Sequence, residues 1–229
     1  TALRHYGKGL ELAEETGDQL QIARALNNYS IATMGAGRFD LTETNLKRAL
    51  EIIETMEDSE SPYVPLLKIV IRINLGDNHR RAGNYTRAIP FFLAGMERAE
   101  EAGNLRLLTN LLLDFSNLFI ATGDTEEALR MLDRADLHNS EVSSQELDVR
   151  STNLRGMAHL RAGNLELAWE NFVRGSQAAL QGNAPSNVAN GLYGLALAHD
   201  LRGRRERAQE LAKLGREVDP TSGGLLSKW

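Results

Sequence analysis

Histidines are the side chains best suited to chemistry in this chain, and three of the five occupy one place in a repeat. His79, His159 and His199 each stand four residues before a recurring glycine. A zinc ion needs its ligands about 2 Å from one point, whereas equivalent positions on stacked helices lie about 8–10 Å apart. We therefore interpret these histidines as packing residues that replace an aromatic side chain between paired helices. No metal and no other cofactor is expected.

Other catalytic patterns are missing or incomplete. The segment Gly7-Lys8-Gly9 lies in a helical pattern, whereas a phosphate-binding loop needs a preceding strand, a longer turn and Lys-Ser/Thr. Acidic pairs such as Glu126-Glu127 are typical of solvated helix ends. No His-Glu-x-x-His and no Gly-x-Ser-x-Gly occurs. We therefore expect a protein that binds a partner and is not an enzyme.

Glycines recur at a nearly constant interval and indicate the architecture that positions these residues. The gaps between them are 46, 40, 40 and 40 residues, and the series is Gly37, Gly83, Gly123, Gly163 and Gly203. Each glycine separates two stretches of helical periodicity. A period of this size is typical of a solenoid, which offers a long surface to a partner.

Composition excludes several classes of function. The 229 residues are 42% apolar and 25% charged, which is ordinary for a folded protein. The net charge of −5 disfavours nucleic acid and anionic membranes as partners. No apolar run approaches the roughly 18 residues of a membrane span, and there is no cysteine. We expect a cytoplasmic protein, and because the chain starts Thr1-Ala2 we expect it to be truncated at its N-terminus.

The periodicity predicts an all-α, right-handed superhelix of eleven helices forming a single array over residues 1–229. A lone helix within 1–18 precedes five helix pairs, and the pairs cover 19–58, 62–102, 105–138, 143–182 and 185–220, with a tail at 221–229. Ser143 and Glu146 suggest a capping box for the helix that opens the fourth pair. The acidic stretch 57–62 predicts an exposed connection.

Small residues recur five places after the turn glycine, at Ala88, Ala128, Ala168 and Ala208, with Thr42 in the first pair. Small residues also recur seven places before that glycine, at Ser30, Gly76, Ser116, Gly156 and Ala196. Small side chains on facing helices let two backbones approach closely. We therefore assign both series to packing between the helices of a pair.

These residues resemble the tetratricopeptide repeat family. The best match is Asn74-Leu75-Gly76, Gly83-Asn84-Tyr85, Ala88, Phe92 and Gly95, and a second is Leu195, Gly203 and Ala208. The period of 40 exceeds the standard 34. Such long units are similar to those of bacterial transcription activators of the maltose-activator kind. They also resemble the repeats of kinesin light chains and of spindle-orientation adaptors.

The resemblance implies that the first helix of each pair lines a concave groove. The family's groove positions carry over to Arg24, Asn27, Asp77, Arg80, Arg81, Asn110, Asn117, Arg150, Asn153, Met157, Arg161, Asn190 and Tyr193, with Asn74 one residue off this register. Five of these are asparagines, which could hold a peptide backbone or could be tolerated polar surface residues. Five arginines against two aspartates, Asp77 and the further groove position Asp200, make the face locally positive, which suits an acidic partner unless the arginines are merely solvated.

Two functions remain open from the sequence. The first is the effector-sensing or interaction domain of a bacterial transcription activator or related switch protein, with a peptide, a protein or a small molecule as its effector. The second is a free-standing adaptor that binds an extended peptide in its groove. Uncapped ends could also join copies of the chain into a homo-oligomer.

Overall fold

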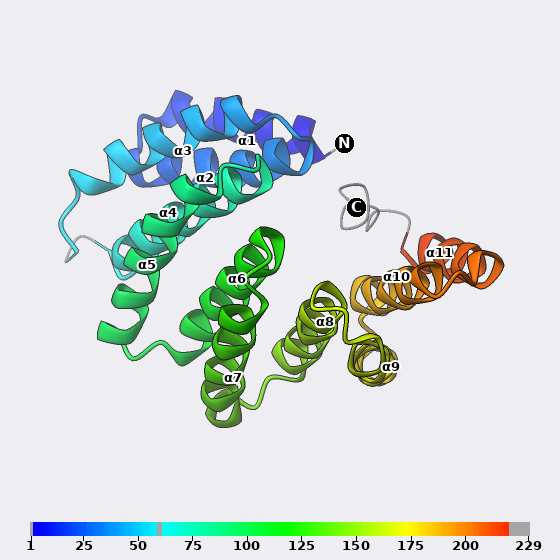
Figure 1. Ribbon diagram of the computed structural model, residues 1–229. Helices are drawn as coiled ribbons and strands as arrows, with labels where there is room; N and C mark the ends of the chain where they lie inside the picture. The colour runs from blue at the N-terminus through cyan, green and yellow to red at the C-terminus, as the bar shows by residue number, and fades with distance from the viewer. Residues whose placement is uncertain (1, 59–60, 220–229) are drawn as a thin grey trace. The chain divides into compact units, whose positions relative to one another are not determined.

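The computed structural model describes residues 2–58 and 61–219. These residues form eleven α-helices and no strand, which confirms the predicted all-α class (Figure 1). The chain is divided into two compact units, Thr1–Asn104 and Leu105–Trp229, and each is described by itself. Residues 59–60 of the predicted acidic connection and the predicted tail at 221–229 lie outside the described residues.

Unit 1 is a single helix followed by two helix pairs. Its helices are α1 (Ala2–Thr16), α2 (Gln19–Gly35), α3 (Phe39–Glu54), α4 (Tyr63–Arg81) and α5 (Tyr85–Glu101). We call the first helix of each pair an A-helix and the second a B-helix, and α1 precedes the first pair. The A-helices α2 and α4 pack on each other as well as on their own B-helices α3 and α5.

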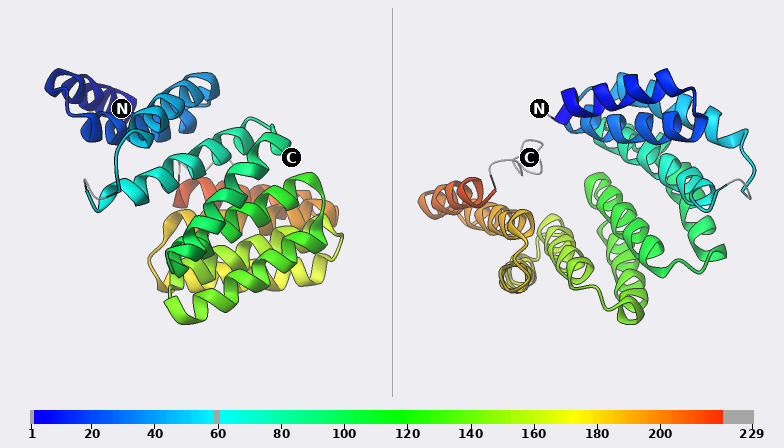
Figure 2. Two further views of the ribbon diagram at one scale, coloured as in Figure 1. Left: turned by 90° about the vertical axis from the view of Figure 1, so that its left-hand side faces the viewer. Right: turned by 180° about the vertical axis from the view of Figure 1, so that it is seen from behind.

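Unit 2 consists of three helix pairs. Its helices are α6 (Leu105–Thr122), α7 (Thr125–Val142), α8 (Gln145–Arg161), α9 (Leu165–Gln181), α10 (Pro185–Leu201) and α11 (Arg205–Val218). The A-helices α6, α8 and α10 form a row in which each packs on the next (Figure 2). The B-helix α7 continues to Val142, past the predicted limit at 138.

Left-handed backbone separates the helices at a regular spacing. The five recurring glycines lie between the helices of each pair with φ from 73° to 91°, and Gly83, at 82°, confirms its predicted left-handed conformation. Between pairs, Gly103, Ser143 and Asn183 stand 40 residues apart and have φ of 60°, 54° and 51°. Serine and asparagine thus occupy a conformation that glycine adopts without steric cost.

The capping box predicted from Ser143 and Glu146 is wrong. Ser143 ends α7 in the left-handed conformation, and Ser144 is the N-cap of α8 without a side-chain capping bond. The buried Asn139 binds the backbone of Ser144 instead: its Oδ1 accepts from Ser144 N at 3.3 Å, and its Nδ2 donates to the Ser144 carbonyl at 3.0 Å and to the Asp148 carboxylate. A contact from the last turns of the preceding helix therefore replaces the predicted box.

Glycines on the A-helices make room for aromatic rings, as the small-residue pattern predicted. Phe172 of α9 is fully buried between α8 and α10. A Cβ atom added to Gly156 would lie 2.7 Å from Phe172 Cε1, and one added to Gly194 would also collide with this ring. In unit 1, a Cβ on Gly76 would lie 3.3 Å from Cε1 of the buried Phe92. The small residues are thus packing residues.

Two of the three repeated histidines pack on aromatic rings. The His79 ring stacks on Phe91 at 5.6 Å between centroids, and His199 meets Trp169 edge-on at 4.9 Å. Burial lowers the pKa of His79, His159 and His199, because the charged form loses its hydration. Among the described residues, no three potential ligands gather in a way that could hold a metal ion. No helix within those residues is long and apolar enough to cross a membrane.

Candidate functional site

The predicted site residues lie on the A-helices, so their geometry is set by how neighbouring A-helices pack. In unit 1 the polar contact between these helices is a pair of amides. Asn27 of α2 is buried, and its Oδ1 accepts a hydrogen bond from Asn74 Nδ2 of α4 at 2.8 Å. Asn74, one residue off the predicted register, is therefore the partner that the buried Asn27 requires. These two amides join α2 to α4.

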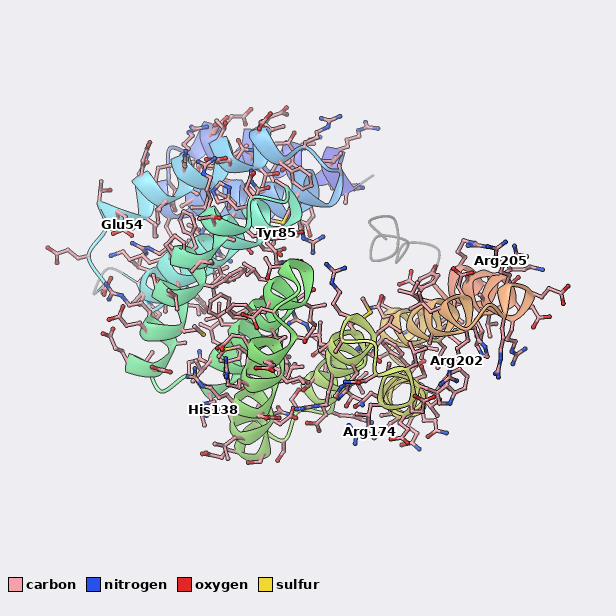
Figure 3. All side chains as sticks on the ribbon, viewed as in Figure 1. Glu54, Tyr85, His138, Arg174, Arg202 and Arg205 are labelled. Atoms are coloured by element: carbon pink, nitrogen blue, oxygen red, sulfur yellow. The ribbon has the colours of Figure 1, made fainter. Side chains whose placement is uncertain are left out.

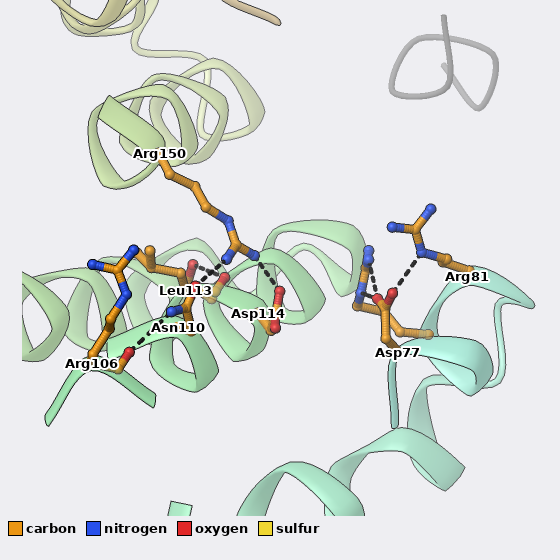
Figure 4. A network of polar contacts seen from close by, with 9 residues as sticks. Asp77, Arg81, Arg106, Asn110, Leu113, Asp114 and Arg150 are labelled. Atoms are coloured by element: carbon orange, nitrogen blue, oxygen red, sulfur yellow. Dashed lines mark hydrogen bonds and ion pairs between the residues drawn. The ribbon is translucent and has the colours of Figure 1, made fainter. Parts of the chain in front are cut away.

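Asp77 organises the C-terminal end of α4. Its carboxylate accepts from Arg80 Nε at 2.9 Å and from Arg81 Nε at 2.7 Å (Figure 4). Burial acts to raise the pKa of Asp77, but the two guanidinium groups outweigh burial and hold it below its ordinary value. Arg24 of α2 is exposed, and its guanidinium lies 5.6 Å above the centre of the Tyr63 ring, a cation–π distance.

Arg150 connects two A-helices of unit 2. It extends from α8 to α6, where Nη1 donates to Asn110 Oδ1 at 3.1 Å and Nη2 forms an ion pair with Asp114 (Figure 4). Asn110 is held in turn by its own Nδ2, which donates to the Arg106 carbonyl at 3.0 Å. Asp114 was missed by the sequence analysis. It stands four residues after Asn110, on the same helix face, and that spacing was the available signal.

Two predicted site residues are buried between helices. Asn153 Nδ2 donates to the Asn187 carbonyl of α10 at 3.2 Å, and its Oδ1 packs against Gly175 of α9. The Tyr193 ring packs on Gly215 of α11, where an added Cβ would lie 2.9 Å from Tyr193 Cε1. Both side chains are almost inaccessible to solvent. They join neighbouring helices and do not offer polar atoms to a partner.

Three predicted residues of unit 2 remain half-buried with part of the side chain open: Asn117, Met157 and Asn190. Within the described residues, the amides of Asn117 and Asn190 have no hydrogen-bond partner. Met157 packs at the edge of the core around Phe172. Arg161 is exposed near the end of α8, with its guanidinium 3.9 Å from the place of a Cβ on Gly123. We call Asn110, Asp114, Asn117, Arg150, Met157, Arg161 and Asn190 the A-helix face of unit 2.

Carboxylates reduce the positive charge expected of these surfaces. In unit 1, Asp77 pairs with both Arg80 and Arg81. In unit 2, Asp114 pairs with Arg150. Since an ion pair between neighbours cancels most of the field at a distance, the arginines contribute less attraction for an acidic partner than their number indicates.

A cavity of about 390 Å³ lies elsewhere in unit 1, where the ends of α3 and α5 meet the start of α4. Charged side chains line it, including Glu54 (Figure 3). Two of its basic side chains already form ion pairs, since Arg72 pairs with Glu54 at 2.6 Å and Lys68 with Asp58 at 2.8 Å. The cavity therefore presents closed ion pairs, and the A-helix faces are the better candidates for a site.

Comparison with known proteins agrees with this arrangement of paired helices. Sequence models of the tetratricopeptide repeat match residues 68–135 and residues 189–213. These two stretches match tetratricopeptide repeats. A search among curated proteins found no match to the sequence.

Solved structures with similar folds include two Rap proteins. One, complexed with competence and sporulation factor, has a TM-score of 0.75 and 13% identity, over 89% of this chain and 55% of that one. This chain thus spans about half the length of that Rap protein. The other is the Rap conjugation gene regulator of the plasmid pLS20 in complex with the Phr* peptide. It has a TM-score of 0.71 and 13% identity, over 97% of this chain and 70% of that one.

Another similar structure is a kinesin light chain from Podosopora anserina with TPR-like repeats. Its TM-score is 0.61 at 15% identity, over 87% of this chain and 95% of that one. The predicted likeness to kinesin light chain repeats is thereby confirmed at the level of the fold. At these identities the three structures establish the fold alone.

Proposed function

We propose that the A-helix face of unit 2 binds an extended segment of a peptide or protein. The observation that carries this proposal is the pair Asn117 and Asn190, half-buried amides without a hydrogen-bond partner within the described residues. A polar group partly removed from water gains stability when a ligand supplies its hydrogen bonds. An amide offers a donor and an acceptor together, which suits the backbone of an extended chain whatever its side chains.

The spacing of the A-helices sets the length of that segment. Packed helices lie about 8–10 Å apart, so two steps from α6 to α10 cover about 20 Å. Asn117 and Asn190 also differ in height along their helices, because they stand six and thirteen residues before their turn glycines. An extended chain rises about 3.3 Å per residue, so about seven residues connect the two amides.

The charged side chains of the face contribute less to the proposed binding than the open amides do. Arg150 is engaged by Asn110 and Asp114, so it stiffens the face more than it attracts a distant carboxylate. Met157, on α8 between the two open amides, offers an adaptable apolar contact to a partner side chain. We therefore infer that the partner is held mainly through its backbone, and that affinity depends weakly on salt.

We infer further that the chain is the effector-sensing or interaction domain of a switch protein, such as a bacterial transcription activator. The Rap conjugation gene regulator, solved with a peptide on a similar fold, supports this inference. A switch requires that the effector bind one state more tightly than the other. The likeness to a kinesin light chain supports a second candidate, an adaptor that holds an extended peptide without changing state.

The experiment is selection of binders from a library of random seven-residue peptides, followed by titration of the best peptide against variants. Replacing both Asn117 and Asn190 by alanine should weaken binding by about 1–3 kcal/mol, because two neutral hydrogen-bonding groups are lost. The matched control is Asn164→Ala, an exposed asparagine at the turn before α9 without a side-chain capping bond. It should leave affinity unchanged.

Two outcomes would overturn the proposal: equal affinity of the double variant and the wild type, or an equal loss in the Asn164→Ala control. Switch and adaptor are then separated with the full-length gene product. In a switch, the selected peptide changes the activity of the domains joined to the repeats. In an adaptor, it competes with another partner and changes no activity.

A further inference from the structure

Helix α1 has small and aromatic residues at the positions that other B-helices use to pack on their A-helices. Ala2, Tyr6, Gly9 and Ala13 stand 15, 11, 8 and 4 residues before the left-handed Gly17. The same offsets from the left-handed Gly103 and Asn183 give two matching sets: Ala88, Phe92, Gly95 and Ala99 in α5, and Ala168, Phe172, Gly175 and Ala179 in α9. By this register α1 is a B-helix.

In complete pairs these positions are covered by the A-helix of the same pair. Phe92 and Phe172 are fully buried. Gly175 faces Asn153 of α8 so closely that an added Cβ would collide with the Asn153 amide. In α1 the equivalent Tyr6 is 45% exposed, and a Cβ on Gly9 would meet no atom within 4 Å. Ala13 is buried, but the positions of Ala2, Tyr6 and Gly9, whose equivalents pack in the other B-helices, are open here.

The other side of α1 packs on the following A-helix, α2, as the B-helix α9 packs on the following A-helix, α10. A Cβ on Gly7 would lie 3.6 Å from Tyr29 Cε2 of α2, and Leu10 packs on the core of unit 1. In the same way Ser176 of α9 packs on Gly191 of the following α10. The helix α1 therefore has one covered side and one open side, and the open side matches an interface that recurs within this chain.

We propose that the open side of α1, defined by Ala2, Tyr6 and Gly9, binds a helix of the A type. This partner is an amphipathic helix with a small residue opposite Tyr6, as Gly76 lies opposite Phe92 and Gly156 opposite Phe172. It would continue the interface already repeated at α4–α5 and α8–α9. A second copy of the chain does not fit this role, because each described A-helix is already packed on its own B-helix.

The chain itself supplies the probe. Helix α8 packs on the B-helix α9, which has the same pattern of small and aromatic residues as α1. A labelled synthetic peptide of residues 145–163 is titrated into the protein and followed by fluorescence anisotropy. We expect saturable binding, and we expect a peptide with Gly156→Leu to bind about tenfold more weakly or worse, because the leucine blocks the approach of Tyr6.

Variants of the protein locate the site. Gly9→Leu should weaken binding about tenfold or more while leaving the fold intact, because nothing lies near Gly9 and leucine favours a helix. The matched control is Glu11→Leu, since the equivalent Glu97 of α5 faces solvent in a complete pair. It should leave binding unchanged.

Three outcomes would overturn the proposal: no saturable binding up to millimolar peptide, equal binding by wild type and Gly9→Leu, or self-association of the protein that Gly9→Leu abolishes. The last is measured by sedimentation of the protein alone, and it would make a second copy the occupant. None of these outcomes depends on Asn117 or Asn190, so failure here is distinguishable from failure of the proposed peptide site.

Discussion

Replacing Gly156 by alanine should destabilise unit 2, although alanine is the better helix former. The added Cβ would lie 2.7, 2.8 and 3.0 Å from Cε1, Cδ1 and Cζ of Phe172. The ring cannot retreat, because Gly194 of α10 faces the same ring just as closely. Overpacking costs about 1–3 kcal/mol, whereas alanine gains about 1 kcal/mol over glycine inside a helix. The expected net loss in free energy of unfolding is therefore about 1 kcal/mol.

Urea unfolding followed by circular dichroism measures this loss, with Trp169 fluorescence in a Trp229→Phe background to assign it to unit 2. Gly9→Ala is the control, because a Cβ there meets no atom within 4 Å. It should stabilise unit 1 by about 0.5–1 kcal/mol. If Gly156→Ala were as stabilising as Gly9→Ala, the ring of Phe172 would have room to move. Phe172 would then not be held tightly between Gly156 of α8 and Gly194 of α10.

Further predictions test packing, the ion pair and the buried histidines. Ala128→Leu should cost about 1–3 kcal/mol at a fully buried site, and Ala121→Leu, on the half-buried face of α6, far less in the same urea titration. A double-mutant cycle on Arg150 and Asp114 should give a coupling of about 0.5–1 kcal/mol that falls with salt. Burial lowers the pKa of His199, so the unfolded state binds more protons below about pH 6.5 and stability falls as pH drops through that range. His199→Phe should flatten this fall, as measured by unfolding between pH 7 and 5.

The fold was predictable because its determinants repeat within the chain. Gly83 and its equivalents predict a left-handed turn, and Ala88 and its equivalents predict a closely packed helix pair. Both predictions hold without knowledge of the residues on the facing helix. The contacts at the boundary between α7 and α8 were not predictable. The box expected at Ser143 gave way to the buried Asn139, because an amide on the preceding helix reaches the backbone of Ser144. Although Asn139 stands only five residues before Ser144, neither residue type alone predicts this bond.

The helix that carries each candidate residue could be predicted, but not which of these side chains are open to a partner. Asn153 and Tyr193 stand at the predicted positions of their A-helices. Their side chains are nevertheless buried between helices, because Gly175 and Gly215 leave space for them. Asp114 was overlooked, because its importance comes from Arg150 on the next A-helix. The chemistry of a repeat surface is thus decided by contacts one period apart, which a single repeat does not reveal.

Variation among the repeats points to the kind of partner. The packing position five residues after the turn glycine is alanine in four pairs. Within unit 2, the face position thirteen residues before that glycine changes from pair to pair, from Asn110 through Arg150 to Asn190. A repetitive partner would be matched by a repetitive face. A face whose residues differ at each step instead fixes one register for a non-repetitive segment, because a shift by one repeat would set each contact against the wrong side chain. The small residues keep the helices in place, and in the proposed peptide site the changing face residues set the register of the backbone that Asn117 and Asn190 hold.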